Sequence, residues 1–135
     1  RIDGYRKALR DLEVSNDFEL EIFVERQNYK ADLIDKFDCL FDEVPDVDGF
    51  FFSTHYLALE SIRYFISHKI DYHTRFNMGC FHETTALDIL CPEMSISRMP
   101  IEEMGTQAIK ILLENVNDKN FSHKGVVVNN QLTLR

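Results

Sequence analysis

Apolar residues along this chain switch repeatedly between the spacing of helices and the spacing of strands. Helical spacing, with apolar residues every three or four positions, covers residues 1–12, 31–41, 57–66 and 101–116, with a shorter stretch at 84–91. Alternating or contiguous apolar residues, which are typical of strands, cover residues 18–24, 47–52, 75–81, 94–97 and 131–135. Pro100 suits the first turn of the last helix, where its missing N–H is tolerated.

The order of these segments predicts the fold class. Helices and strands that alternate in this way predict an α/β fold with a parallel, doubly wound sheet of about four to six strands. The run Phe50-Phe51-Phe52 suits a strand that is buried on both faces of such a sheet. In an open α/β sheet, ligands bind beyond the carboxyl ends of the strands, so the loops that follow the strands are the candidate site.

Composition narrows the class of protein. The 135 residues are 44% apolar and 28% charged, which is typical of one globular domain with a real core. A net charge of −8 argues against direct contact between this segment and a nucleic acid backbone. No apolar run approaches the roughly 20 residues of a membrane span. Three cysteines without a CxxC pair indicate reduced thiols in a cytoplasmic protein.

Motifs for catalysis and for cofactors are missing from the sequence. Neither GxGxxG nor GxxxxGK follows a strand, and no GxSxG is present, so we expect no enzyme activity and no cofactor. His55, Cys80 and His82 lack further ligands at the spacing of a structural zinc site, so we expect no metal. A Cys80–His55 thiol–imidazole pair would lack an orienting carboxylate.

The loops after the strands contain several side chains that suit ligand contact. These are Gln27, Thr54, His55, Phe81, His82 and Met99. Each has a plainer alternative: Thr54 suits a helix N-cap, Phe81 suits the core, and His82 suits a solvated loop.

Four segments together resemble a known family. They are Arg1-x-x-Gly4-Tyr5, residues 47–59, Gly79-Cys80-Phe81-His82 and Ser95-x-Ser97-x-x-Pro100-x-x-x-Met104-Gly105. In this pattern the chain resembles the C-terminal effector-binding, periplasmic-binding-protein-like domain of lactose/galactose-repressor family transcriptional regulators. The resemblance implies that Arg1 reaches into the effector pocket.

The resemblance also implies a domain organisation. Residues 1–96 and about 121–135 would form the C-terminal lobe of a two-lobed domain, and the helix of about 100–117 would belong to the other lobe. The first lobe and the DNA-binding head would lie outside this chain. An apolar helix left without its lobe is expected to cause self-association, since large exposed apolar patches drive it.

The function implied is the sensing of a small, sugar-related molecule that controls DNA binding allosterically. We expect a cytoplasmic homodimer that touches DNA only through its head and does not contact a membrane. The alternative is a solute-binding protein of a transporter or sensor.

Departures from the family pattern concern the pocket. The strand-end Asn-Asp of the family is Thr54-His55 here, its strand-end Asp is Phe81, and a polar residue near the last crossover is Met99. Because carboxylates are the usual acceptors for sugar hydroxyls, we hypothesise that the ligand is not a plain monosaccharide, or that one binds weakly.

Overall fold

The computed structural model describes residues 1–13, 21–117 and 125–135, and within these it contains one four-stranded sheet. The strands are β1 (Gly49–Phe52), β2 (Asn77–Phe81), β3 (Ser95–Arg98) and β4 (Gln131–Thr133), in the order β1-β2-β3-β4. The first three are parallel. The sheet confirms the predicted α/β class.

The prediction of a parallel sheet is wrong for β4, which runs antiparallel to β3. The register pairs Arg98, the last residue of β3, with Gln131, the first residue of β4. The chain therefore leaves the sheet after β3 and returns at the same end, which forces the returning strand to run the opposite way.

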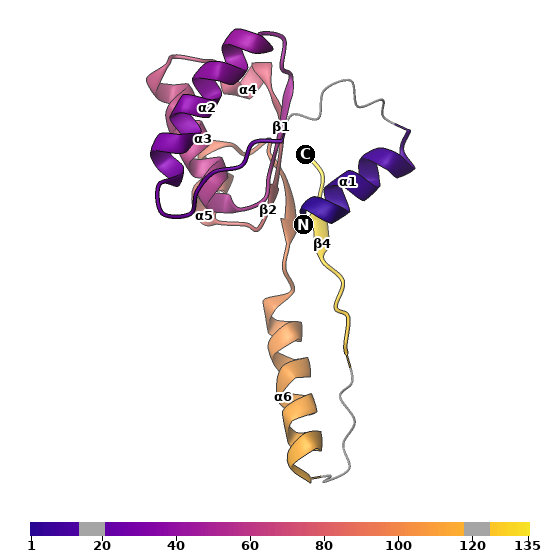
Figure 1. Cartoon of the computed structure of the whole chain (residues 1–135). Helices are drawn as coiled ribbons and strands as arrows, with labels where there is room; N and C mark the ends of the chain where they lie inside the picture. The colour runs from indigo at the N-terminus through magenta and orange to yellow at the C-terminus, as the bar shows by residue number, and fades with distance from the viewer. Residues whose placement is uncertain (14–20, 118–124) are drawn as a thin grey trace.

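Helices lie on both faces of the sheet (Figure 1). One face of the sheet is covered by α2 (Tyr29–Glu43), α3 (His55–Ser67), α4 (Tyr72–Arg75) and α5 (Thr85–Leu90). Helix α1 (Ile2–Asp11) lies on the opposite face. Helices α3 and α5 connect the parallel strands in sequence, which is the usual crossover arrangement. The sequence pattern did not predict the short helix α4.

The core lies between the sheet and helices α2 and α3, and it is rich in aromatic rings. Phe65 on α3 is fully buried. Its ring centroid lies 5.6 Å from that of Phe37 on α2, 5.6 Å from that of Phe50 on β1 and 5.1 Å from that of Phe76. Offset and edge-on aromatic pairs at these distances add to the free energy gained by burying apolar area.

The opposite face of β1 is less covered than the sequence predicted. Phe51 remains 53% exposed, and its ring stacks on Tyr5 of α1 with centroids 6.1 Å apart. The expectation that β1 is buried on both faces is therefore wrong at Phe51, because α1 is the one described helix on that side and covers only part of it.

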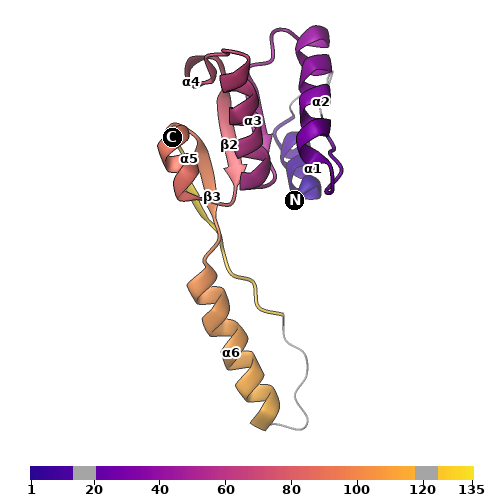
Figure 2. The same ribbon diagram turned by 90° about the vertical axis from the view of Figure 1, so that its left-hand side faces the viewer.

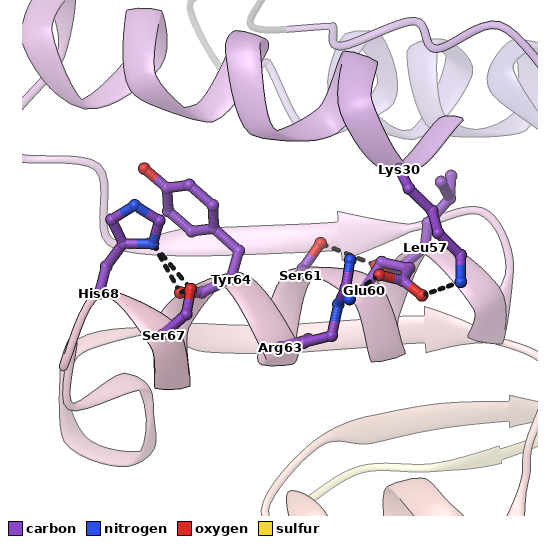
Figure 3. A network of polar contacts seen from close by, with 8 residues as sticks. All are labelled: Lys30, Leu57, Glu60, Ser61, Arg63, Tyr64, Ser67 and His68. Atoms are coloured by element: carbon purple, nitrogen blue, oxygen red, sulfur yellow. Dashed lines mark hydrogen bonds and ion pairs between the residues drawn. The ribbon is translucent and has the colours of Figure 1, made fainter. Parts of the chain in front are cut away.

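Polar contacts fix α3 against α2 and along its own length (Figure 3). Glu60 on α3 lies 3.1 Å from Lys30 Nζ on α2 and 2.8 Å from Arg63 Nε. The Ser61 hydroxyl donates to the Leu57 carbonyl at 2.8 Å. These contacts hold the orientation of α3, whose first residue, His55, faces the loops described below.

The strand predicted at residues 18–24 is not seen in its described part, residues 21–24. Residues 18–20 lie outside the described residues, and residues 21–24 have no strand structure. Ile22 and Val24 nevertheless pack against the core. The alternating pattern therefore reflects burial of one side of this segment, although the segment does not pair with the sheet. Arg6 Nε of α1 donates to Glu21 at 2.7 Å and attaches this segment to α1.

Helix α6 (Ile101–Asn117) projects away from the sheet (Figures 1 and 2). None of its residues is buried. Its exposed apolar side chains are Ile101, Met104, Ile109, Leu112, Leu113 and Val116. Among the described residues, no helix is both long enough and apolar enough to span a membrane.

Candidate functional site

The carboxyl ends of β1 and β2 lie side by side and bring two loops together. The parallel register pairs Phe52 of β1 with Cys80 of β2. The residues that follow, Ser53 to His55 after β1 and Phe81 to His82 after Cys80, therefore leave the sheet at the same edge. This is the edge at which the sequence placed a ligand site.

Arg1 joins both loops from a third part of the chain. Its Nη1 donates to the Ser53 carbonyl at 2.9 Å, and its Nη2 donates to His82 Nε2 at 3.1 Å. The guanidinium carbon lies 4.7 Å from the centre of the Phe81 ring, a cation–π contact. We call Arg1, Ser53, His55, Phe81 and His82 the strand-tip cluster.

His55 completes this cluster from the start of α3. Its ring centroid lies 6.1 Å from that of His82 and 4.1 Å from that of Tyr56. His55 Nδ1 is buried and has no hydrogen-bond partner among the described residues. Because a buried polar atom without a partner is costly in free energy, its presence favours a role other than packing.

Thr54 has the plainer of its two predicted roles. Its side-chain oxygen accepts a hydrogen bond from the Leu57 N–H at 3.4 Å and caps the N-terminus of α3. The Thr54 hydroxyl thus orients α3, and with it His55.

The backbone of His82 is held in an uncommon conformation. Its φ of 90° lies in the left-handed region that favours glycine, and its N–H donates to the Ser97 carbonyl of β3 at 3.1 Å. Such strain costs on the order of 1–3 kcal/mol and is often found at functional sites. The strain directs the His82 side chain toward Arg1.

His82 is neutral near pH 7. Partial burial lowers the pKa of His82 below its ordinary value of 6.5, and the charge of Arg1 and the neighbouring His55 lower it further. A neutral ring agrees with the hydrogen bond, because Nε2 can accept from Arg1 only when the ring proton is on Nδ1.

Cys80 lies directly before the cluster, and its surroundings disfavour a thiolate. The residue is fully buried, and burial raises the pKa of its thiol to about 12 against a smaller lowering effect from Arg1. A thiol with this pKa is protonated at neutral pH, which argues against the thiol–imidazole alternative. Among the described residues, no group of three or more His, Cys, Asp or Glu side chains could hold a metal ion.

Two predicted site residues do not join the cluster. Gln27 is exposed in the turn before α2, and Met99 lies half-buried between β3 and α6, where its carbonyl accepts from the Ile101 N–H at 2.9 Å. Among the described residues, no hydrogen bond or ring contact joins either side chain to the cluster. Ser53, which the sequence analysis did not single out, contributes only a backbone carbonyl, and a main-chain role leaves no signal in residue type.

Similar solved structures share this fold. A protein assigned as a transcription regulator from Staphylococcus saprophyticus subsp. saprophyticus is similar over 100% of this chain and 49% of its own, with a TM-score of 0.79 at 18% identity. The transcriptional regulator CelR in complex with cellobiose is similar over 99% of this chain and 40% of its own, with a TM-score of 0.79 at 19% identity. A PurR family transcriptional regulator from Vibrio parahaemolyticus RIMD 2210633 is similar over 98% and 47%, with a TM-score of 0.69 at 14% identity.

These likenesses establish the fold. The chain has the α/β architecture of these regulators, and the fold implied by the resemblance to lactose/galactose-repressor effector domains is confirmed. The chain spans less than half the length of each of these structures. No protein-family model and no curated protein matches the sequence.

Proposed function

We propose that this chain is the effector-sensing part of a bacterial transcription regulator and that the strand-tip cluster contacts the effector. The observation that carries the proposal is the convergence of Arg1, His55, Phe81 and His82 from three separate segments at the carboxyl edge of the sheet. The strained backbone of His82 and the unpartnered Nδ1 of His55 both cost free energy, and a packing role does not explain either cost. All three similar structures named above are described as regulators, which favours sensing over catalysis.

A sugar-related ligand agrees with the chemistry of the cluster. Phe81 is only half-buried, and an aromatic ring at the rim of a site can pack against the apolar face of a sugar or heterocycle. CelR, a structural neighbour, was solved with cellobiose. Gln27 and Met99 are proposed as outer contacts that would approach a larger ligand.

We also propose that α6 packs against a second lobe of the same polypeptide. The chain leaves the sheet after β3, forms α6 and returns as β4 beside β3. Helix α6 therefore extends away from the sheet, and none of its residues belongs to the core. Its exposed apolar side chains need a covering surface, and the similar structures contain roughly twice this length of chain. An effector between the two lobes would then be enclosed.

Regulation requires that the effector bind one arrangement of the lobes better than another. That difference in affinity sets how far the effector shifts the equilibrium between the two arrangements. We propose that this shift acts through a homodimer on a separate DNA-binding head. Net acidity argues against DNA contact by this segment itself.

The test is ligand binding by the complete polypeptide in which this chain occurs. Thermal denaturation would be followed with a panel of neutral and charged mono- and disaccharides, and stabilising compounds would be titrated by calorimetry. We expect Arg1→Gln to weaken binding at least about 10-fold, the loss expected for a charge-assisted hydrogen bond. Arg10→Gln, which removes the same charge from the far end of α1, is the matched control. Absence of binding by any compound, or equal loss in both variants, contradicts the proposal.

A further inference from the structure

We infer that the ligand of the strand-tip cluster carries an anionic group, a carboxylate or a phosphate, that binds against Arg1 between His55 and His82. This inference rests on the proposed function and adds the chemical class of the effector. It follows from the donors that the cluster presents, from the carboxylates that it lacks and from its place at a helix start.

The cluster presents hydrogen-bond donors. Arg1 has five N–H groups, of which two are used by the Ser53 carbonyl and His82 Nε2. Because His82 Nε2 accepts, its ring proton lies on Nδ1 and is a further donor. For His55, Nδ1 is buried and has no partner among the described residues in either tautomer, so this nitrogen is available to a ligand as a donor when it carries the ring proton.

Among the described residues, no carboxylate forms an ion pair with Arg1. Within the described residues, Arg6 pairs with Glu21, Arg98 with Glu83 and Arg135 with Asp88. Arg1 has no such ion pair there and contacts only a neutral carbonyl, a neutral imidazole and an aromatic ring.

The lack of an acidic partner for Arg1 is notable because the chain as a whole is rich in acidic residues, with a net charge of −8. The acidic residue next in sequence to the cluster, Glu83, lies 2.9 Å from Arg98 and forms an ion pair with it instead of with Arg1. A guanidinium without an acid partner beside two imidazoles is an arrangement that an anion complements, since charge-assisted bidentate pairs are the strong ones.

The N-terminus of α3 adds to the positive potential. The helix has 13 residues, begins at His55 and has no acidic residue in its first turn, whereas α1, α2 and α6 each have one or two. Unpaired amides at a helix start favour negative charge. A neutral sugar would need acceptors for its hydroxyl protons, and the cluster offers few.

An anion at this place would also couple binding to protonation. It would favour the charged form of His82, whose pKa is lowered in the free protein. The other ionisable groups here are Arg1 and His55, the buried Cys80 thiol, and Glu83, which is paired with Arg98. Binding of a carboxylate, whose own charge does not change in this range, should therefore take up a proton and tighten between pH 8 and pH 6.

The direct test uses inorganic phosphate and acetate with the complete polypeptide, observed through the imidazole resonances of His55 and His82. We expect saturable shifts of both residues and a rise in the pKa of His82, with no such changes in Arg1→Gln and unaltered behaviour in Arg10→Gln. The inference is wrong if the chemical shifts of His55 and His82 do not change with added phosphate or with added acetate.

Matched ligands separate this inference from the proposed function. Glucose, glucose 6-phosphate and glucuronate share a ring and differ in charge, and the two charged members distinguish phosphate from carboxylate. We expect at least one charged member to bind about 10-fold more tightly than glucose, with the preference lost in Arg1→Gln. If a neutral sugar binds at the cluster as tightly as its charged counterparts, the inference of an anionic ligand is wrong, but the proposed sensing function still holds. Absence of binding by any small molecule overturns both.

Discussion

Arg1 Nη2 lies 3.1 Å from His82 Nε2, and this hydrogen bond joins the residue before α1 to the loop after β2. It links segments 81 residues apart in sequence and makes the ionisation of one ring depend on one guanidinium. His82 has two further unusual properties: burial, with Arg1 and His55 as smaller causes, lowers its pKa, and its φ is positive.

Removal of Arg1 should raise the pKa of His82. Partial burial lowers that pKa most, and the positive charge of Arg1 and the neighbouring His55 add to the effect. In Arg1→Gln the guanidinium charge is gone, so the imidazole should protonate at higher pH in an NMR titration. Arg10→Gln should leave the titration unchanged, and an identical His82 titration in wild type and Arg1→Gln would refute the link.

Acid should destabilise the folded chain through the same histidine. The pKa of His82 is below 6.5 in the folded state, so the unfolded state binds more protons as pH falls through that range. The contribution of His82 to stability is thus fully present above about pH 6.5 and declines below it. Urea denaturation at several pH values would measure this slope, which should be smaller in Arg1→Gln. An equal slope in both proteins would speak against it.

The strained backbone of His82 predicts that one substitution affects stability and binding differently. His82→Gly removes the conformational cost of a φ of 90°, and this gain should offset both the greater chain entropy of glycine and the loss of the hydrogen bond from Arg1, so that stability changes by less than about 1 kcal/mol. The same variant should lose ligand affinity. Denaturant midpoints and calorimetric titrations of one preparation would measure both effects, and a clear loss of stability would count against strain at this residue.

Much of the fold could be predicted because burial on one face leaves a periodic pattern. The spacing of Leu33, Phe37 and Leu40 predicted α2, and each of these residues is buried in the core. The pattern failed where burial and pairing separate: Ile22 and Val24 pack on the core without forming a strand. It also could not give the direction of β4, which is set by the return of the chain from α6.

The site was predictable in part for a similar reason. Rules for parallel sheets place the residues after β1 and β2 at one edge, and His55, Phe81 and His82 do meet there. Their closeness to Arg1 was implied only by the family resemblance, since a contact across 81 residues leaves no local pattern. The Ser53 carbonyl could not be foreseen, because every residue carries one.

The three cysteines should differ sharply in reactivity. Cys39 is exposed, whereas Cys80 and Cys91 are buried and burial raises the pKa of each to about 12. Iodoacetamide at neutral pH should therefore modify Cys39 alone until the protein is unfolded, as mass spectrometry of peptides would show. Rapid alkylation of native Cys80 would instead revive a nucleophilic role for that thiol.

Mutations in the aromatic core should change the free energy of unfolding far more than mutations on helix α6. Phe65→Ala should cost about 3–5 kcal/mol, because it empties a fully buried site among aromatic rings. Leu112→Gln and Leu113→Gln should change the stability of this chain by less than about 0.5 kcal/mol, since both side chains are 56% exposed. Urea denaturation would measure both.

Self-association gives a second readout for α6. The apolar helix should make this chain associate on its own, and Leu112→Gln with Leu113→Gln should reduce that association. Glu114→Gln, on the same helix, is the control for a change of polar surface. Sedimentation that shows a strict monomer over a wide range of concentration would remove the proposal that this face requires a covering lobe.

The most direct measurement is the position of a bound effector in a crystal structure of the complete polypeptide. The account predicts a ligand within hydrogen-bond distance of Arg1 and His82 and in contact with the Phe81 ring, beyond the carboxyl ends of β1 and β2. A stabilising ligand bound elsewhere, with the Arg1–His82 hydrogen bond and its surroundings unchanged, would contradict it.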